Sequence, residues 1–345
     1  MKKAFFINGG AGRVLCAIPA LEYYKKNVDP DVVVISEGWD ELFLTSSIRN
    51  NVFSVGHKKL FSDKLRDREL ITLEPYRMNA YFNQKCNLIQ AFDMLINEDK
   101  ETIPETKTFN LEISRHDQAY GYNLVQQVKQ KTGKNKVVVF QPLGSGAKAD
   151  GDFIIDDSGR SFDVKDIITI VREISKHAAV ILMSNVKIPV NENMGAAVPD
   201  ANILQWMGII KMSDYFLGCD SMGQHYAHAL NKPATVVIGS TYPENITYPD
   251  NKEFTIIDNG KDKGKVYNPF RIQMDFDATR NNEDMMVMDD KQVKNIIDSV
   301  LNNVGRIKKE EAKTSTSTLP PLLQKPQQSS VFELANNTKP KKAKK

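Results

Sequence analysis

The sequence has no long apolar run. No stretch of the 345 residues approaches the roughly 18 consecutive apolar residues that a membrane span needs, which excludes a transmembrane protein. Residues 1–7 (MKKAFFI) carry two lysines, but a turn at Gly9 interrupts the segment before it reaches the length of a signal peptide. We therefore expect a cytoplasmic protein.

Cysteine is also scarce. Cys16, Cys86 and Cys219 are odd in number, lie far apart and form no C-x-x-C pair, so reduced thiols are expected rather than a disulfide framework. An alternative zinc site would use four residues close in sequence, Cys219, Asp220, His225 and His228. These residues mix soft and hard ligands and have no matching set elsewhere, so we expect no metal.

The chain has little net charge, +3 from 46 Lys and Arg against 43 Asp and Glu. Residues 306–345 hold ten of the basic and three of the acidic side chains, which leaves 36 basic and 40 acidic, a net charge of −4, in residues 1–305. Because residues 1–305 carry no excess of positive charge, a nucleic-acid partner is not favoured. The tail is rich in Ser, Thr, Pro, Gln and Lys and is predicted to be disordered. Its lysine-rich end is expected to be solvated, with contact to an anionic surface or partner as the alternative.

Short apolar runs alternate with helix-period segments, which is typical of an α/β fold with parallel sheets. The predicted strands are residues 4–7, 32–35, 52–55, 137–140, 179–183, 215–218 and 235–238, and the predicted helices include 87–97, 119–131, 164–174, 203–211, 224–230 and 291–304. A polar turn after residue 132 suggests a boundary between two Rossmann-like domains, 1–132 and 133–305, that face each other across a cleft. Trp39 and Trp206 belong to no motif and are expected in the core or the cleft wall.

A glycine turn follows the first predicted strand. Gly9, Gly10 and Gly12 allow backbone N–H groups to approach a phosphate at the start of the next helix. The spacing fits a dinucleotide motif poorly because Leu15 occupies the place of the third small residue, although Glu37 sits where a ribose-binding acid would. An NAD(P)-dependent oxidoreductase is therefore an alternative interpretation of this loop.

A second glycine turn, Gly144-Ser145-Gly146, follows the strand at 137–140, and Arg160 lies in the loop before the next helix. Backbone amides and a cation together can stabilise a diphosphate leaving group. A further strand, 215–218, leads into the other candidate residues: Asp220, Ser221, Gly223, Gln224 and His225. The alternative is an ordinary strand-to-helix loop in which Asp220 and Ser221 only cap the helix and His225 is a core histidine.

In this order the segments resemble the heptosyltransferases of glycosyltransferase family nine. The family's Gly-Asp, apolar and Pro-Ala-Leu pattern resembles Gly12-Arg13-Val14-Leu15 and Pro19-Ala20-Leu21, and its Asp-Ser/Thr-Gly and His helix resembles Asp220 to Pro233. Arg160 is similar to the family's loop cation. The resemblance covers about residues 3–300 and implies the two-domain GT-B fold.

By this resemblance the chain is an inverting, metal-independent glycosyltransferase without a cofactor. It would move a heptose or hexose from a nucleotide-diphosphate sugar, ADP-linked in the family, to a glycan or lipid-linked acceptor, as in lipopolysaccharide synthesis. The acceptor would face the first domain. The residues that the resemblance assigns to the donor are Gly144, Ser145, Gly146, Arg160, Asp220, Ser221, Gly223, Gln224 and His225.

The sequence departs from the family at the acidic residue of the Gly-Asp pair, the family's general base. That position holds Arg13, whose guanidinium stays protonated and cannot accept a proton. One interpretation gives the role of base to Glu37, Asp40 or His116, and another lets Arg13 bind an anionic acceptor or phosphate. The third is a non-catalytic protein that binds nucleotide sugars or glycans.

Overall fold

The computed structural model describes residues 1–98, 102–150, 153–156, 158–190, 194–265 and 283–306. All of them belong to one unit, Met1–Arg306. The predicted disordered tail therefore lies outside the described residues, apart from Arg306. In the described part of the chain, no helix has the length and apolar character that crossing a membrane requires.

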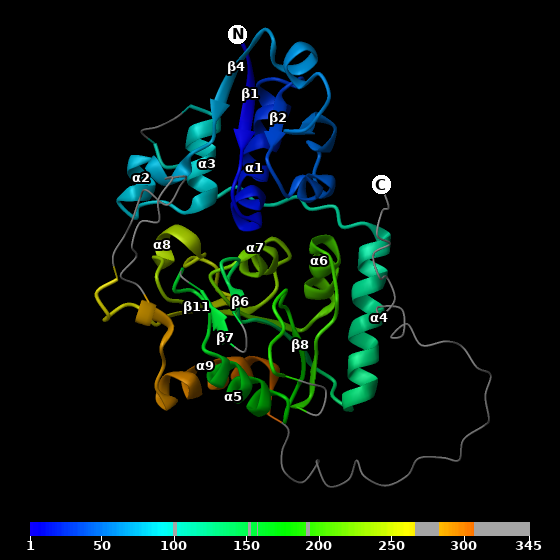
Figure 1. Cartoon of the computed structure of the whole chain (residues 1–345), viewed down its shortest axis with the longest axis vertical. Coiled ribbons are helices and arrows are strands. Elements are labelled where there is room, and N and C mark those ends of the chain that lie inside the picture. The colour runs from blue at the N-terminus through cyan, green and yellow to red at the C-terminus, as the bar shows by residue number, and fades with distance from the viewer. Residues whose placement is uncertain (99–101, 151–152, 157, 191–193, 266–282, 307–345) are drawn as a thin grey trace, which may run out of the picture. The chain divides into compact units, whose positions relative to one another are not determined.

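The first half is built on a parallel sheet (Figure 1). Its strands are β1 (Lys2–Ile7), β2 (Val33–Ser36), β3 (Val52–Ser54) and β4 (Arg68–Thr72), in the order β3-β2-β1-β4. The sequence predicted the first three within one or two residues and did not predict β4. The helices that accompany them are α1 (Ala11–Asn27), α2 (Asn79–Phe82) and α3 (Leu88–Ile96), and α1 packs against α3.

The second half carries a parallel sheet of six strands. They are β5 (Val137–Gln141), β8 (Ala179–Leu182), β9 (Ala196–Ala197), β10 (Tyr215–Cys219), β11 (Ala234–Ile238) and β12 (Phe254–Asp258), in the order β12-β11-β10-β5-β8-β9. Counted along the chain, this is the strand order of a doubly wound Rossmann sheet, and it reverses between β5 and β10. A small antiparallel hairpin, β6 (Lys148–Asp150) and β7 (Phe153–Ile155), projects between β5 and the next helix.

Helices cover both faces of this second sheet. Alternate residues of β5 point to opposite faces, so that Val138 and Phe140 share a core with α5 (Val164–Ile174) and α9 (Asp290–Val304). Val137 and Val139 belong to the other face, which includes buried residues of α4 (Arg115–Thr132), α6 (Ile203–Met212) and α7 (Met222–Ala229). A short helix, α8 (Pro243–Ile246), follows β11. The predicted α/β fold class is thus confirmed.

One hydrophobic core runs through both halves. Phe5 and Val14 of the first half and Tyr226 and Ile246 of the second belong to the same cluster of buried residues. Helix α1 contacts α7 directly, and Figure 1 shows these helices where the two halves meet. The two halves are therefore joined by apolar packing.

Helices α4 and α6 cross unusually closely. A Cβ atom at Gly121 of α4 would lie 2.3 Å from the backbone carbonyl of Gly208, and one at Gly208 of α6 would lie 2.1 Å from the carbonyl oxygen of Asp117. Only glycines permit this crossing, because the opposing atoms are backbone and cannot rotate away. Helix α4 precedes the proposed domain boundary at residue 133 but packs on a helix of the second half.

We expect Gly121→Ala to lower the free energy of unfolding by about 2 kcal/mol or more, because the added methyl forces the two helices apart. Urea unfolding followed by circular dichroism measures the change. The control is Gly56→Ala, since Gly56 is exposed and a Cβ there meets no atom within 4 Å. Equal stability of the two variants would contradict the crossing.

Candidate functional site

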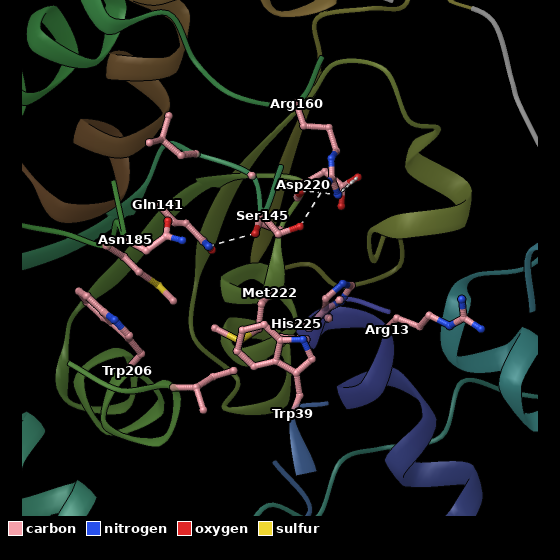
Figure 2. A pocket seen from close by; sticks show the side chains of 18 of the residues that line it. Arg13, Trp39, Gln141, Ser145, Arg160, Asn185, Trp206, Asp220, Met222 and His225 are labelled. Atoms are coloured by element: carbon pink, nitrogen blue, oxygen red, sulfur yellow. Dashed lines mark hydrogen bonds and ion pairs between the residues drawn. The ribbon is translucent and has the colours of Figure 1, made fainter. Parts of the chain in front are cut away.

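A pocket of about 420 Å³ opens where the strand order of the second sheet reverses (Figure 2). Ligands of doubly wound sheets bind at this place, beyond the carboxyl ends of the strands. The pocket contains loop residues that follow β5 and β10 and residues that follow β1 in the first half. Ten of the predicted site residues line it: Gly9, Gly10, Gly12, Arg13, Gly144, Ser145, Arg160, Asp220, Ser221 and His225.

The other predicted residues do not line the pocket. Gly146, Gly223 and Gln224 lie behind its wall, in the same loop and helix as lining residues, whereas Glu37 and Asp40 are exposed on the first half. His116 lies on α4 with most of its side chain in solvent. Trp39 and Trp206, which are expected from the sequence in the core or the cleft wall, line the pocket. The lining residues outside the predicted set are Ala11, Tyr76, Leu88, Gln141, Leu143, Met183, Ser184, Asn185, Ala201, Ile203, Met222 and Ile246.

Gln141 joins the two strands at the reversal. Its amide nitrogen donates a hydrogen bond of 3.0 Å to Ser221 Oγ, and its amide oxygen accepts one of 2.8 Å from the backbone N–H of Gly223. A Cβ at Gly223 would lie 2.4 Å from that oxygen, so the contact requires glycine. The sequence signal for this role is a polar residue at the end of an otherwise apolar strand.

The predicted helix caps are wrong. Ser221 is the residue before α7, but its side chain makes no capping hydrogen bond and its hydroxyl accepts from Gln141 instead. Asp220 Oδ1 accepts a hydrogen bond of 3.0 Å from the Gln224 side chain rather than from a backbone N–H. The side-chain amides of Gln141 and Gln224 donate to these two side chains, so neither side chain caps the N-terminus of α7.

Arg160 reaches across the loops that follow β5 and β10. Its guanidinium donates to Ser145 Oγ and to the backbone oxygen of Asp220, each at 3.4 Å, and lies 4.0 Å from Asp220 Oδ2. Burial lowers the pKa of Arg160, but the carboxylates of Asp220 and Asp156 outweigh it and raise the pKa. The cation is therefore permanently charged at the floor of the pocket.

Asp156 fixes the conformation of the loop that carries Arg160. It accepts hydrogen bonds from the backbone N–H groups and hydroxyls of Ser158 and Ser161. Burial raises the pKa of the Asp156 carboxyl, but these hydrogen bonds dominate and lower the pKa. A Cβ at Gly146 would lie 2.8 Å from Asp156 Oδ1, which explains the glycine there although it does not line the pocket.

His225 lies between Tyr248 of the second half and Gly12 of the first half. Its Nδ1 lies 2.7 Å from the hydroxyl of Tyr248, and a Cβ at Gly12 would lie 2.9 Å from its Cδ2. Burial lowers the pKa of His225 to about 3, so the imidazole is neutral at pH 7. His228 stacks on the ring of Tyr248 with 3.5 Å between centroids, and burial lowers its pKa to about 4.

Arg13 lies against the segment that follows β4. Its guanidinium donates to the backbone oxygen of Leu73 and lies 3.4 Å from Glu74 Oε2 and 5.2 Å from the centre of the Tyr76 ring. The side chain is 4% exposed and that of Glu74 is 18% exposed. Figure 2 shows it extending away from Arg160 and Asp220. The positive charge of Arg13 is thus balanced by the carboxylate of Glu74, which also belongs to the first half.

The cysteines are all buried and unpaired with one another, as predicted. Burial raises the pKa of the Cys16 and Cys219 thiols, and that of Cys86 to about 12, so all three stay protonated. Within the described ranges, no three His, Cys, Asp or Glu side chains gather as ligands for a metal ion.

No family model matches the sequence, and no curated protein sequence matches it either. Solved structures do. The ADP-heptose lipopolysaccharide heptosyltransferase II of E. coli is 12% identical over 88% of this chain and 98% of its own, with a TM-score of 0.53. The iron-containing dodecameric glycosyltransferase TibC of enterotoxigenic E. coli H10407 is 11% identical over 88% of this chain and 77% of its own, with a TM-score of 0.54.

TibC in complex with ADP-D-β-D-heptose, described as a heptosyltransferase, is also similar in structure. It is 11% identical over 88% of this chain and 78% of its own, with a TM-score of 0.51. These likenesses confirm the structural resemblance to heptosyltransferases and the GT-B-like fold that the sequence predicts. At such identities the likeness is one of fold.

Acid should destabilise the protein through His225. Its pKa is lower in the folded chain than the ordinary 6.5, so the unfolded chain takes up a proton as the pH falls below 6.5 and stability is lost from there downward. At pH 5 this one group costs about 2 kcal/mol of the free energy of unfolding. We expect the melting temperature of His225→Gln to fall less between pH 7.5 and 5.0 than that of the parent. His57→Gln, at an exposed histidine, is the control and should keep the parent's slope.

The pairing of Arg13 with Glu74 predicts non-additive stability. Arg13→Gln alone leaves the carboxylate without its partner and should cost about 3 kcal/mol of the free energy of unfolding. Arg13→Gln/Glu74→Gln removes both charges and should recover at least half of that loss. Urea unfolding at pH 7 measures both. A double variant less stable than the single one would show that the Glu74 carboxylate is stabilised by a partner other than Arg13, which would contradict the pairing.

Proposed function

We propose that the chain binds a nucleoside diphosphate sugar at the carboxyl ends of β5 and β10 and transfers its sugar, with inversion, to a glycan or other acceptor on the first half. The observation that carries the proposal is the position of Arg160, whose guanidinium contacts both Ser145 and Asp220. A diphosphate at the strand reversal meets this cation, and negative charge that develops on the leaving group is stabilised by it. The transfer we propose uses this cation rather than a metal ion.

The fold supports this assignment. Heptosyltransferase II and TibC share the fold, and TibC is described with ADP-heptose bound. We therefore propose ADP-heptose as the first donor to test. Asn185 and Trp206 extend the pocket beyond β8 on the same half. That apolar and amide-lined end offers room for a nucleoside next to the diphosphate.

Transfer needs a group that accepts the proton of the acceptor hydroxyl. Arg13 occupies the matching position on the first half and cannot do so, and Glu37 and Asp40 do not line the pocket. Asp220 is the one carboxylate among the described residues that do. Its Oδ1 accepts from Gln224, whereas Oδ2 is buried without a hydrogen bond, 4.0 Å from the Arg160 guanidinium, and we propose that oxygen as the proton acceptor.

A second candidate is a protein that binds nucleotide sugars without transferring them. The observation that favours it is the buried pair of Arg13 and Glu74, because an arginine cannot accept a proton at the position where the resemblance implies an acid. Release of ADP from ADP-heptose in the presence of glycoside acceptors separates the two. Release that Asp220→Asn abolishes supports transfer, and binding without release supports the second candidate.

A thermal-shift panel tests the donor site. ADP, GDP, UDP and dTDP are added to the full chain, with NAD and NADP included for the oxidoreductase interpretation. We expect one nucleoside diphosphate to stabilise the protein, by about 2.7 kcal/mol at a hundredfold excess over its dissociation constant.

The matched pair of variants for this panel is Arg160→Gln and Arg172→Gln. Both remove one arginine from the second half, but Arg172 is exposed on α5 and does not line the pocket. The shift should disappear in Arg160→Gln and persist in Arg172→Gln. Stabilisation by NAD or NADP alone would favour the oxidoreductase, and no shift with any nucleotide would refute the donor site.

A further inference from the structure

The wall that the first half contributes to the pocket is aromatic and has little charge. Trp39, on the loop between β2 and the 3₁₀ helix at Asp40–Thr45, lines the pocket, as do Tyr76 and Leu88. Trp39 is 41% exposed, so much of a large apolar side chain lies open at the pocket instead of being packed in the core. Figure 2 shows its indole rising from the first half toward the second.

The backbone of Trp39 is held in the left-handed region, with φ 60° and ψ 26°. Bulky residues rarely adopt this conformation, and such a strained position persists only where the surroundings impose it. Here the Ser36 hydroxyl donates to the backbone oxygen of Gly38, and the N–H of Leu42 donates to that of Trp39. Among the non-glycine residues of the described chain with positive φ, Trp39 is the one that lines the pocket.

Among the described residues that line the pocket, no cation is left for an anionic acceptor. Arg13 and Arg160 are the basic side chains among its described lining residues. Arg13 is paired with Glu74, and Arg160 lies beside Asp220, where the proposed diphosphate binds. His225 is neutral at pH 7 because burial lowers its pKa. A phosphate or carboxylate on the acceptor would therefore lose water without gaining a partner.

We propose that the acceptor is an uncharged pyranoside whose apolar ring face stacks on the indole of Trp39. The C–H bonds of one face of a pyranose point outward together and carry slight positive charge, which suits the negative face of an aromatic ring. The indole N–H can donate to a ring hydroxyl at the edge of the stack. The site selects for shape and neutrality rather than for a charged group. This inference rests on the proposed function, because the sugar is assigned the role of acceptor.

The chain has two tryptophans, so Trp206→Phe leaves Trp39 as the sole tryptophan fluorophore. The full-length variant is titrated, without nucleotide, with the methyl glycosides of glucose, galactose, mannose and N-acetylglucosamine, and separately with glucose 6-phosphate and galacturonate. We expect at least one neutral glycoside to change Trp39 emission and to protect it from acrylamide quenching. The two anionic sugars should bind about tenfold more weakly than the neutral glycoside or not at all.

A pair of variants assigns the stacking. Trp39→Ala should weaken glycoside binding, measured by calorimetry, about tenfold, and Trp39→Phe should restore most of it because a ring face returns. Leu44→Ala is the matched control, since Leu44 is an exposed apolar residue of the neighbouring 3₁₀ helix that does not line the pocket. Nucleoside diphosphate binding, measured by thermal shift, should be the same in all three variants.

The outcomes separate this inference from the donor assignment. Nucleotide binding without any glycoside response at Trp39, or tighter binding of an anionic sugar, overturns the neutral acceptor and leaves the donor site intact. A Trp39 response to the nucleotide alone, with nothing added by glycosides, assigns the indole to the donor and also overturns the inference. Glycoside stacking in a protein that binds no nucleotide refutes the proposed function while the sugar site stands.

Discussion

The close approach of α1 to α7 sets the geometry of the pocket. Gly12 lies in the first turn of α1, and the imidazole of His225 occupies the space that any side chain at position 12 would need. His225 is in turn held by the hydroxyl of Tyr248, which is buried and stacked on His228. Because this contact is packed and uncharged, the glycine loop of the first half stays opposite the Arg160 loop of the second, and both loops line one pocket.

Few charged side chains line the pocket among the described residues. Each arginine at the pocket has a carboxylate near it, Glu74 for Arg13 and Asp220 for Arg160, but the two pairs differ in access. Arg13 is turned toward Leu73 and Glu74, which follow β4. Arg160 lines the pocket, donates a hydrogen bond of 3.0 Å to Ser158 Oγ and lies 3.4 Å from Ser145 Oγ and the backbone oxygen of Asp220. The side chain of Arg13 is 4% exposed and that of Arg160 is 20% exposed, so Arg160 is the more accessible of the two cations.

The sequence predicted the parts of the fold that are buried on both faces. Val137–Gln141 and Tyr215–Cys219 consist almost entirely of buried apolar residues, so a continuous apolar run marks each strand. β4 was missed because it lies at a sheet edge, and Arg68–Thr72 mixes charged with half-buried residues. The glycine turns and Arg160 could be located from their place after a strand.

The rest of the site depends on contacts between distant segments. Gln141 is recognised only once its amide is seen to bridge Ser221 and Gly223, about eighty positions away. Trp39 belongs to no motif, and its role follows from a backbone conformation and an exposure that no local pattern encodes. The cap expected of Ser221 failed for the same reason, since a partner from another strand takes its hydroxyl.

The crossing of Gly121 with Gly208 decides to which half of the structure α4 belongs. It packs α4 closely on α6, so α4 is part of the second half although it comes before the polar turn at 133. The backbone N–H of Glu112 donates to the carbonyl of Thr45 in the first half, and Ser114 caps α4 only two residues later. Between these two contacts the chain passes from the first half to the second at Ile113. The direct connection between the halves is therefore short, and α4 belongs to the second half by its packing rather than by its place in the sequence.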